Sequence, residues 1–163
     1  MAKRRSIFWA VVSATAIILV ASLLWWKLRA TPSPIPQNIS RKVDFTLFYP
    51  TKLPKSYNID SSSFQATSGP VVTYNAEGSQ GHHIIFSIQP RPETFNFEAF
   101  YAQGIVGTSK FTTDYGDAAI GAANNKLMGS LTSDESWVIV TADNPSVTRA
   151  DLRTILKNLR SKQ

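Results

Sequence analysis

The sequence predicts a single α+β domain: an antiparallel sheet of about six or seven strands with a short internal helix and a C-terminal packing helix, preceded by one N-terminal transmembrane helix. Three observations support this prediction. Short segments rich in β-branched and aromatic residues, separated by turn residues, recur between residues 43 and 141. An amphipathic helical pattern follows residue 147, and an uncharged apolar run occupies residues 7–26.

The apolar run predicts a membrane anchor. It holds 20 residues, and a helix of that length, rising about 1.5 Å per residue, spans roughly the 30 Å hydrocarbon core of a bilayer. Trp9 near one end, and Trp25 and Trp26 at the other, suit the two headgroup levels. A cleaved signal peptide ending near residues 20–22 is the main alternative, and the apolar residues beyond that point favour an uncleaved signal-anchor.

The basic residues on both sides of the run predict its orientation. Residues 3–5 are Lys-Arg-Arg, whereas Lys27 and Arg29 follow the run. This bias favours a cytoplasmic N-terminus over residues 1–6 and an extracytoplasmic C-terminal domain. We therefore expect a single-pass protein of the cell membrane, with the lipid bilayer as a partner through residues 7–26. The six residues before the run are too few for a folded cytoplasmic regulator.

The net charge of +6 suggests nucleic-acid binding at first sight. The first 30 residues, however, carry five Lys or Arg and no acidic residue, and the rest carries 12 Lys or Arg against 11 Asp or Glu. The excess positive charge therefore belongs mainly to the anchor, and we expect no nucleic-acid partner. The chain has no cysteine, which excludes disulfides and thiol chemistry.

Residues 27–42 are predicted to form a juxtamembrane, proline-rich spacer ahead of a domain over residues 43–163. Prolines at positions 32, 34 and 36 favour an extended polyproline conformation. In the domain, residues 43–49 alternate, with Val43, Phe45, Leu47 and Tyr49 on one face of a strand. Further strands are expected at residues 57–67, 71–76 and 82–89, separated by Pro-rich and Gly-rich turns.

The second half of the domain contains a short helix, a hairpin and the strongest strand. Residues 95–103 suit a helix with Asn96 as its N-cap and with Phe95 and Phe100 as a hydrophobic staple. The remaining strands are expected at residues 118–123, 126–132 and 136–141, and residues 111–114 are a candidate for one further short strand. Asn124-Asn125 suits the hairpin turn because asparagine tolerates left-handed backbone conformations.

The C-terminal helix is the clearest helical pattern of the domain. Thr148 stands at the N-cap, Asp151 at the capping-box position, and Val147 can staple onto Leu152. One apolar stripe, which we expect to pack against the sheet, is formed by Leu152, Ile155, Leu156 and Leu159.

Two segments resemble known bacterial ectodomains. Residues 50–57, Pro-Thr-Lys-Leu-Pro-Lys-Ser-Tyr, resemble a P-x-x-L-P-x-G-Y opening, with Ser56 in place of glycine. Residues 147–159 resemble a capped terminal helix of the form S-x-E-E-L-x-x-I-x-x-S-L, with its acidic pair reduced to Asp151. Both features occur in uncharacterised ectodomains of membrane-anchored bacterial proteins, some related to anti-sigma-factor and sporulation proteins. The resemblance implies a bacterial, extracytoplasmic domain of the same fold, and it carries no catalytic residue across.

No residue pattern predicts a catalytic, cofactor-binding or metal-binding site. His82 and His83 are adjacent on an expected strand, so their side chains point to opposite faces and cannot easily chelate one metal. Residues 61–63 are serines without a nucleophile-elbow pattern. The acidic pairs, Asp134 with Glu135 and Asp114 with Asp117, suit turns or surface charges, and Gly104 with Gly107 lacks a phosphate-loop context.

These observations favour a non-enzymatic, membrane-anchored extracytoplasmic binding or scaffolding module of the cell envelope. Its expected partner is another envelope protein, and no cofactor is expected. One alternative is a transmembrane regulatory or sensor component that acts through helix pairing. Another is an envelope hydrolase or a carrier of apolar ligands, which would require a deep cavity lined by converging polar groups.

Overall fold

The computed structural model describes residues 32–67 and 69–162, and the chain from Ser33 onward forms one compact unit. The predicted anchor at residues 7–26 lies outside the described residues. Within the described ranges, no helix has the length and apolarity needed to cross a bilayer.

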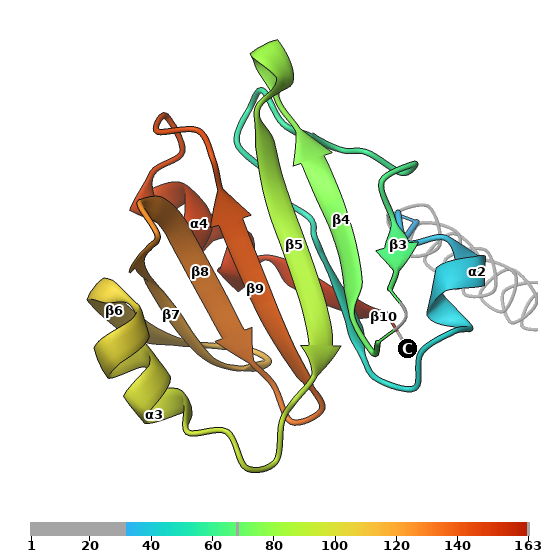
Figure 1. Cartoon of the computed structure of the whole chain (residues 1–163). Coiled ribbons are helices and arrows are strands. Elements are labelled where there is room, and N and C mark those ends of the chain that lie inside the picture. Colours follow the sequence, from blue (N-terminus) through green and yellow to red (C-terminus); the bar gives the residue numbers. More distant parts are fainter. Residues whose placement is uncertain (1–31, 68, 163) are drawn as a thin grey trace, which may run out of the picture. The chain divides into compact units, whose positions relative to one another are not determined.

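The main feature of the unit is an eight-stranded antiparallel sheet (Figure 1). Seven strands follow the order β2-β4-β5-β9-β8-β7-β6, and β3 also pairs with β4. Their bounds are β2 Asn58–Ile59, β3 Gln65–Ala66, β4 Val72–Glu77, β5 His83–Pro90, β6 Val106–Thr113, β7 Gly116–Ala123, β8 Lys126–Thr132 and β9 Ser136–Ala142. The predicted α+β class with an antiparallel sheet is therefore confirmed, although the sheet contains more strands than expected.

One face of the sheet is covered by a helix and a two-stranded ribbon. The helix is α4 (Arg149–Lys157), and the ribbon pairs β1 (Leu47–Pro50) with β10 (Leu159–Lys162). Figure 1 shows α4 behind β8 and β9. The predicted cap of this helix is confirmed: the Thr148 side chain accepts a hydrogen bond from the Asp151 backbone N–H, and the Asp151 carboxylate accepts one from the Thr148 backbone N–H.

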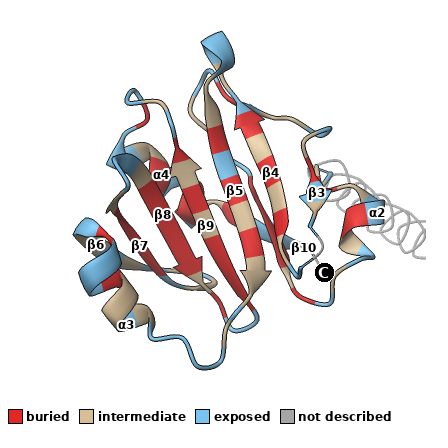
Figure 2. Cartoon of the chain, in the orientation of Figure 1, coloured by how far each residue is buried: buried red, intermediate tan, exposed pale blue. Residues whose placement is uncertain are grey.

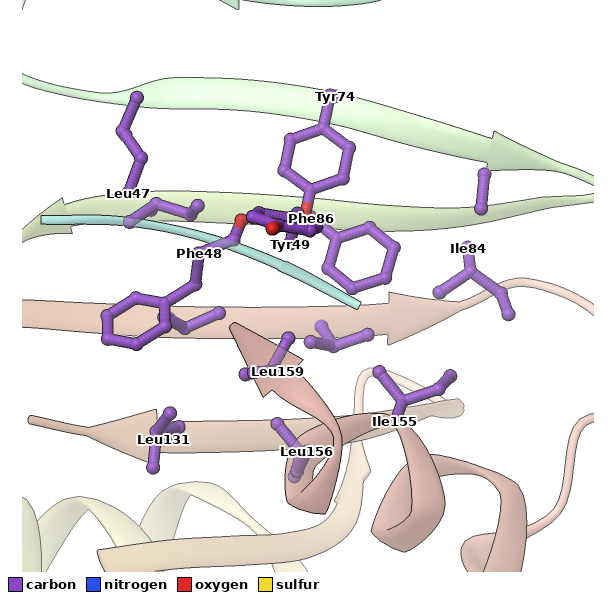
Figure 3. Packing of buried hydrophobic residues seen from close by; sticks show 14 of the residues in the cluster. Leu47, Phe48, Tyr49, Tyr74, Ile84, Phe86, Leu131, Ile155, Leu156 and Leu159 are labelled. Atoms are coloured by element: carbon purple, nitrogen blue, oxygen red, sulfur yellow. The ribbon is translucent and has the colours of Figure 1, made fainter. Parts of the chain in front are cut away.

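The main core lies between this layer and the sheet (Figures 2 and 3). At its centre the Tyr74 ring stacks between Phe64 and Phe86, with ring centroids 4.4 and 4.6 Å away. The Tyr74 hydroxyl donates to the Phe48 carbonyl oxygen at 2.9 Å, which joins the sheet to the ribbon. Complete burial raises the pKa of Tyr74 well above its ordinary value, because the charged phenolate would be desolvated.

The prediction of one continuous strand over residues 57–67 is wrong, because the chain turns within this range. The structure contains only the short strands β2 and β3, separated by a turn at Asp60. The Asp60 carboxylate accepts hydrogen bonds from the Ser62 hydroxyl at 2.6 Å and from the Ser62 backbone N–H at 2.8 Å. These bonds favour the charged carboxylate and lower the pKa of Asp60 below its ordinary value.

Two other element boundaries also differ from the prediction. The C-terminal helix ends at Lys157, so Leu159 is buried in β10 rather than on the helical stripe. The first strand starts at Leu47, and all four residues of β1 are buried. Alternation is lost there because Phe48 also packs edge-on against Tyr115, with centroids 5.1 Å apart.

The compact unit begins earlier than the sequence indicates, at Ser33 rather than Val43. Ile35 and Ile39, the latter in the one-turn helix α2 (Gln37–Ser40), are only 3% and 5% exposed and belong to the main core. The Lys162 ammonium donates to the Ile35 carbonyl oxygen at 2.6 Å. Part of the predicted spacer is therefore packed onto the domain, because its two isoleucines supply apolar surface to the core.

Candidate functional site

The second face of the sheet carries a short helical segment formed by α3 (Phe97–Ala99) and the π-helical turn η2 (Phe100–Gly104). The predicted N-cap is confirmed, since the Asn96 side chain accepts from the Ala99 N–H at 2.9 Å. The predicted staple is also present, with the Phe95 and Phe100 rings 5.5 Å apart. Strand β6, which follows this segment, starts at Val106 rather than at the predicted residue 111.

A second, smaller core fixes the helical segment to the sheet. It contains Tyr101 from the segment and Ile105 directly after it, with Ala119 and Met128 from the strands. Gly121 allows the close approach, because a Cβ atom there would lie only 2.1 Å from Ile105 Cγ2. The segment therefore docks at a site that the sheet leaves open for it.

A pocket of about 410 Å³ opens between this segment and the ends of β6, β7 and β8. Its lining residues are Arg91, Phe97, Glu98, Tyr101, Lys110, Phe111, Thr112, Asp117, Ala118 and Thr132. Strand register places Thr112 opposite Asp117, and Asp117 opposite Thr132, so these three side chains share the pocket face. The residues that alternate with these three along the strands point to the face of the sheet that α4 covers. The backbone of the strands therefore forms the floor of the pocket.

The aromatic wall of the pocket is held by a buried hydroxyl network. The Tyr101 hydroxyl lies 3.1 Å from both Ser130 Oγ and Thr132 Oγ1. Trp137 Nε1 donates to the same Ser130 oxygen at 2.7 Å, and its ring lies edge-on to Phe97 with centroids 5.3 Å apart. The irregular turn that carries Tyr101 is of the π type often found at functional sites.

Two charged groups of the pocket are paired and two are not. Lys110 and Glu98 form the only ion pair within 4.0 Å among residues 32–67 and 69–162. Arg91 lies over the Phe97 ring, 5.8 Å from its centroid, and within the described residues its guanidinium donates only to the Ser133 carbonyl oxygen, at 3.4 Å. Asp117 is exposed and has no side-chain hydrogen bond to another described residue. The pocket therefore presents one guanidinium and one carboxylate that no described side chain neutralises.

The acidic residues noted in the sequence lie mostly at another place. Thr46 and Glu135, joined by a hydrogen bond, border two smaller cavities of about 270 and 320 Å³. Asp114 and Asp134 line the first of these. In the described part of the chain, no three His, Asp or Glu side chains are placed to hold a metal ion together.

The histidines lie away from the pocket. The backbone N–H of His83 donates to the Asp143 carboxylate at 3.0 Å, at the start of β5. His83 Nδ1 is buried and accepts no hydrogen bond from the described residues. The serines at 61–63 lie around the Asp60 turn, and Ser62 and Ser63 bond to Asp60.

Sequence reasoning identified only Asp117 among the charged pocket residues and interpreted it as a surface charge. Arg91 had one usable signal, since Pro90 and Pro92 restrict the backbone on both sides of it. The sequence holds no comparable signal for Lys110 and Tyr101, because only the docking of the helical segment brings these two residues together.

No protein-family model, curated protein or solved structure matches this chain.

Proposed function

We propose that this protein is a non-enzymatic binding module that is anchored in the cell membrane and displays its domain outside the cytoplasm. The pocket beside α3 and η2 carries the proposal, because an ordered aromatic wall there meets unneutralised charges. Binding sites typically combine an apolar wall with a few polar groups that orient the ligand. The apolar run at residues 7–26 and its basic flanks support the membrane location.

The chemistry of the pocket favours binding over catalysis. The buried Tyr101 hydroxyl forms its hydrogen bonds within the described residues to the hydroxyls of Ser130 and Thr132 alone. A nucleophilic hydroxyl needs a neighbouring base to remove its proton. Among the described residues, neither a histidine nor a carboxylate is hydrogen-bonded to this hydroxyl, so its arrangement favours binding.

Site-directed photocrosslinking in native membranes tests the proposed binding. A photoreactive residue replaces Phe95, which is 38% exposed and contacts both Phe97 and Phe100. The control carries the same group at Thr154, an exposed position of α4 on the other face. We expect a defined adduct from position 95 only. Adducts of equal yield from both positions, or none from either, would contradict the proposal.

The location has its own test, because the chain contains no cysteine. Gly69 is exposed and has open space around it, so Gly69→Cys introduces a single accessible thiol. A membrane-impermeant maleimide should label this variant in intact cells. Labelling only after the membrane is permeabilised would place the domain in the cytoplasm.

A further inference from the structure

We infer that the pocket binds a zwitterionic ligand of the amino-acid or short-peptide class, with one carboxylate, one ammonium group and an apolar side chain. This inference rests on the proposed binding function and specifies its ligand. It follows from the two unneutralised charges that line the same pocket and from the aromatic wall next to them.

Arg91 is the group that would hold the carboxylate. The guanidinium offers five N–H donors in a planar fork. Within the described residues it forms one hydrogen bond, to the Ser133 carbonyl oxygen. The Phe97 ring and the two flanking prolines restrict where the side chain can lie. A carboxylate can therefore accept two parallel bonds from the remaining donors.

Asp117 is the group that would hold the ammonium. It lies between Thr112 and Thr132 in the cross-strand register, and their hydroxyl oxygens are further acceptors. Thr132 precedes Ser133, the residue that Arg91 contacts. Arg91 and Asp117 line the same pocket and form no ion pair within 4.0 Å of each other, so one small zwitterion can lie between them.

The other lining groups restrict the ligand to this class. Lys110 and Glu98 neutralise each other, so the four charged residues of the pocket sum to zero. Phosphate groups and polyanions require an excess of cations, which this lining lacks. A purely apolar ligand would leave Arg91 and Asp117 covered and unpaired, which is unfavourable. The Phe97 and Tyr101 rings provide the surface for one apolar side chain.

Trp137 provides the binding signal, because its ring contacts Phe97. Replacing Trp9, Trp25 and Trp26 by Phe leaves Trp137 as the only tryptophan in the full chain, which is then reconstituted in lipid nanodiscs. The probe is the dipeptide alanyl-phenylalanine, titrated to about 5 mM, a range that detects even weak binding. We expect a saturable change in Trp137 emission. The C-terminal amide and the N-acetyl form should each bind about tenfold more weakly, because each lacks one charge-assisted bond.

Paired variants show whether the two charges act as inferred. Arg91→Gln should bind the dipeptide about as weakly as its amide, and Asp117→Asn should bind it about as weakly as its N-acetyl form. Arg91→Gln should then bind the amide as well as it binds the dipeptide, and Asp117→Asn should bind the N-acetyl form as well as it binds the dipeptide. Lys126→Gln is the control, since Lys126 is exposed at the opposite end of the β7–β8 hairpin. It should bind every probe as the parent does.

Equal affinity for the dipeptide and its two modified forms would overturn the inferred ligand class, and so would the absence of saturation by the dipeptide. The binding function is tested separately by the adduct at position 95. An adduct at that position without dipeptide binding would leave the binding function intact and reject this ligand class alone.

Discussion

The hydroxyl of Ser130 connects the pocket wall to the sheet, and its removal is a direct test of this structure. Ser130 is fully buried on β8. Its oxygen accepts from Trp137 Nε1 at 2.7 Å and lies 3.1 Å from the Tyr101 hydroxyl. Ser130→Ala removes this oxygen and leaves the volume of the site almost unchanged.

The expected cost follows from the partners that remain. Tyr101 keeps its contact with Thr132 Oγ1 at 3.1 Å, so it loses only one of two bonds. Trp137 Nε1 loses the one acceptor recorded for it among the described residues and stays buried. An unsatisfied buried donor costs about 1–3 kcal/mol. We therefore expect Ser130→Ala to lower the free energy of unfolding by about 2 kcal/mol, and Thr132→Val by about 1 kcal/mol or less.

Urea unfolding of the full chain in mild detergent, followed by the circular dichroism of the sheet, measures these differences. A double-mutant cycle with Trp137→Phe isolates the bond, because phenylalanine has no N–H to satisfy. We expect a coupling energy of about 1 kcal/mol or more between the two positions. Additive costs, or a Ser130→Ala cost no larger than that of Thr132→Val, would refute the proposed network.

Three further predictions concern the core, the docking site and the Asp60 turn. Leu156→Ala empties a fully buried position of α4, and urea unfolding should show a loss of about 3 kcal/mol; a loss below about 1 kcal/mol would contradict the packing. Gly121→Ala places a methyl group against Ile105, and the same assay should show a loss of about 1–3 kcal/mol. Unchanged stability would mean that the segment docks elsewhere. Asp60 has a lowered folded pKa, so its ionisation stabilises the fold above its ordinary pKa of 3.8. The stability difference between the parent and Asp60→Asn should therefore be present at neutral pH and disappear as the pH falls through the folded pKa, whereas a pH-independent difference would exclude the charge as its cause.

Local patterns predicted several elements well, and each has a local physical cause. Asn124 and Asn125 adopt φ angles of 51° and 60°, the left-handed conformations that the turn requires and asparagine tolerates. The N-caps of α3 and α4 formed as predicted because each depends on residues only three positions apart. Strands β4 and β9 lie within about one residue of their predicted limits.

Elements that depend on distant partners were predicted poorly. Strand β10 exists because Leu159–Lys162 pairs with Leu47–Pro50, more than a hundred residues earlier in the chain. The first half of β6 contains a register irregularity between Val106 and Ser109, where the Arg149 guanidinium donates to the Gly107 carbonyl at 2.7 Å. A sequence pattern holds no information on a carbonyl that a side chain from another element satisfies.

The sequence by itself determined the features that depend on neighbouring residues: the α+β class, the antiparallel strands, the caps and turns, and the expectation of an anchor at residues 7–26. Tertiary structure alone decided that Ile35 and Ile39 belong to the core and that Arg91 and Asp117 meet in one pocket. The physical reason is that periodicity and capping act over a few residues. Pocket formation instead requires the helical segment to dock on a sheet whose strands are distant in sequence.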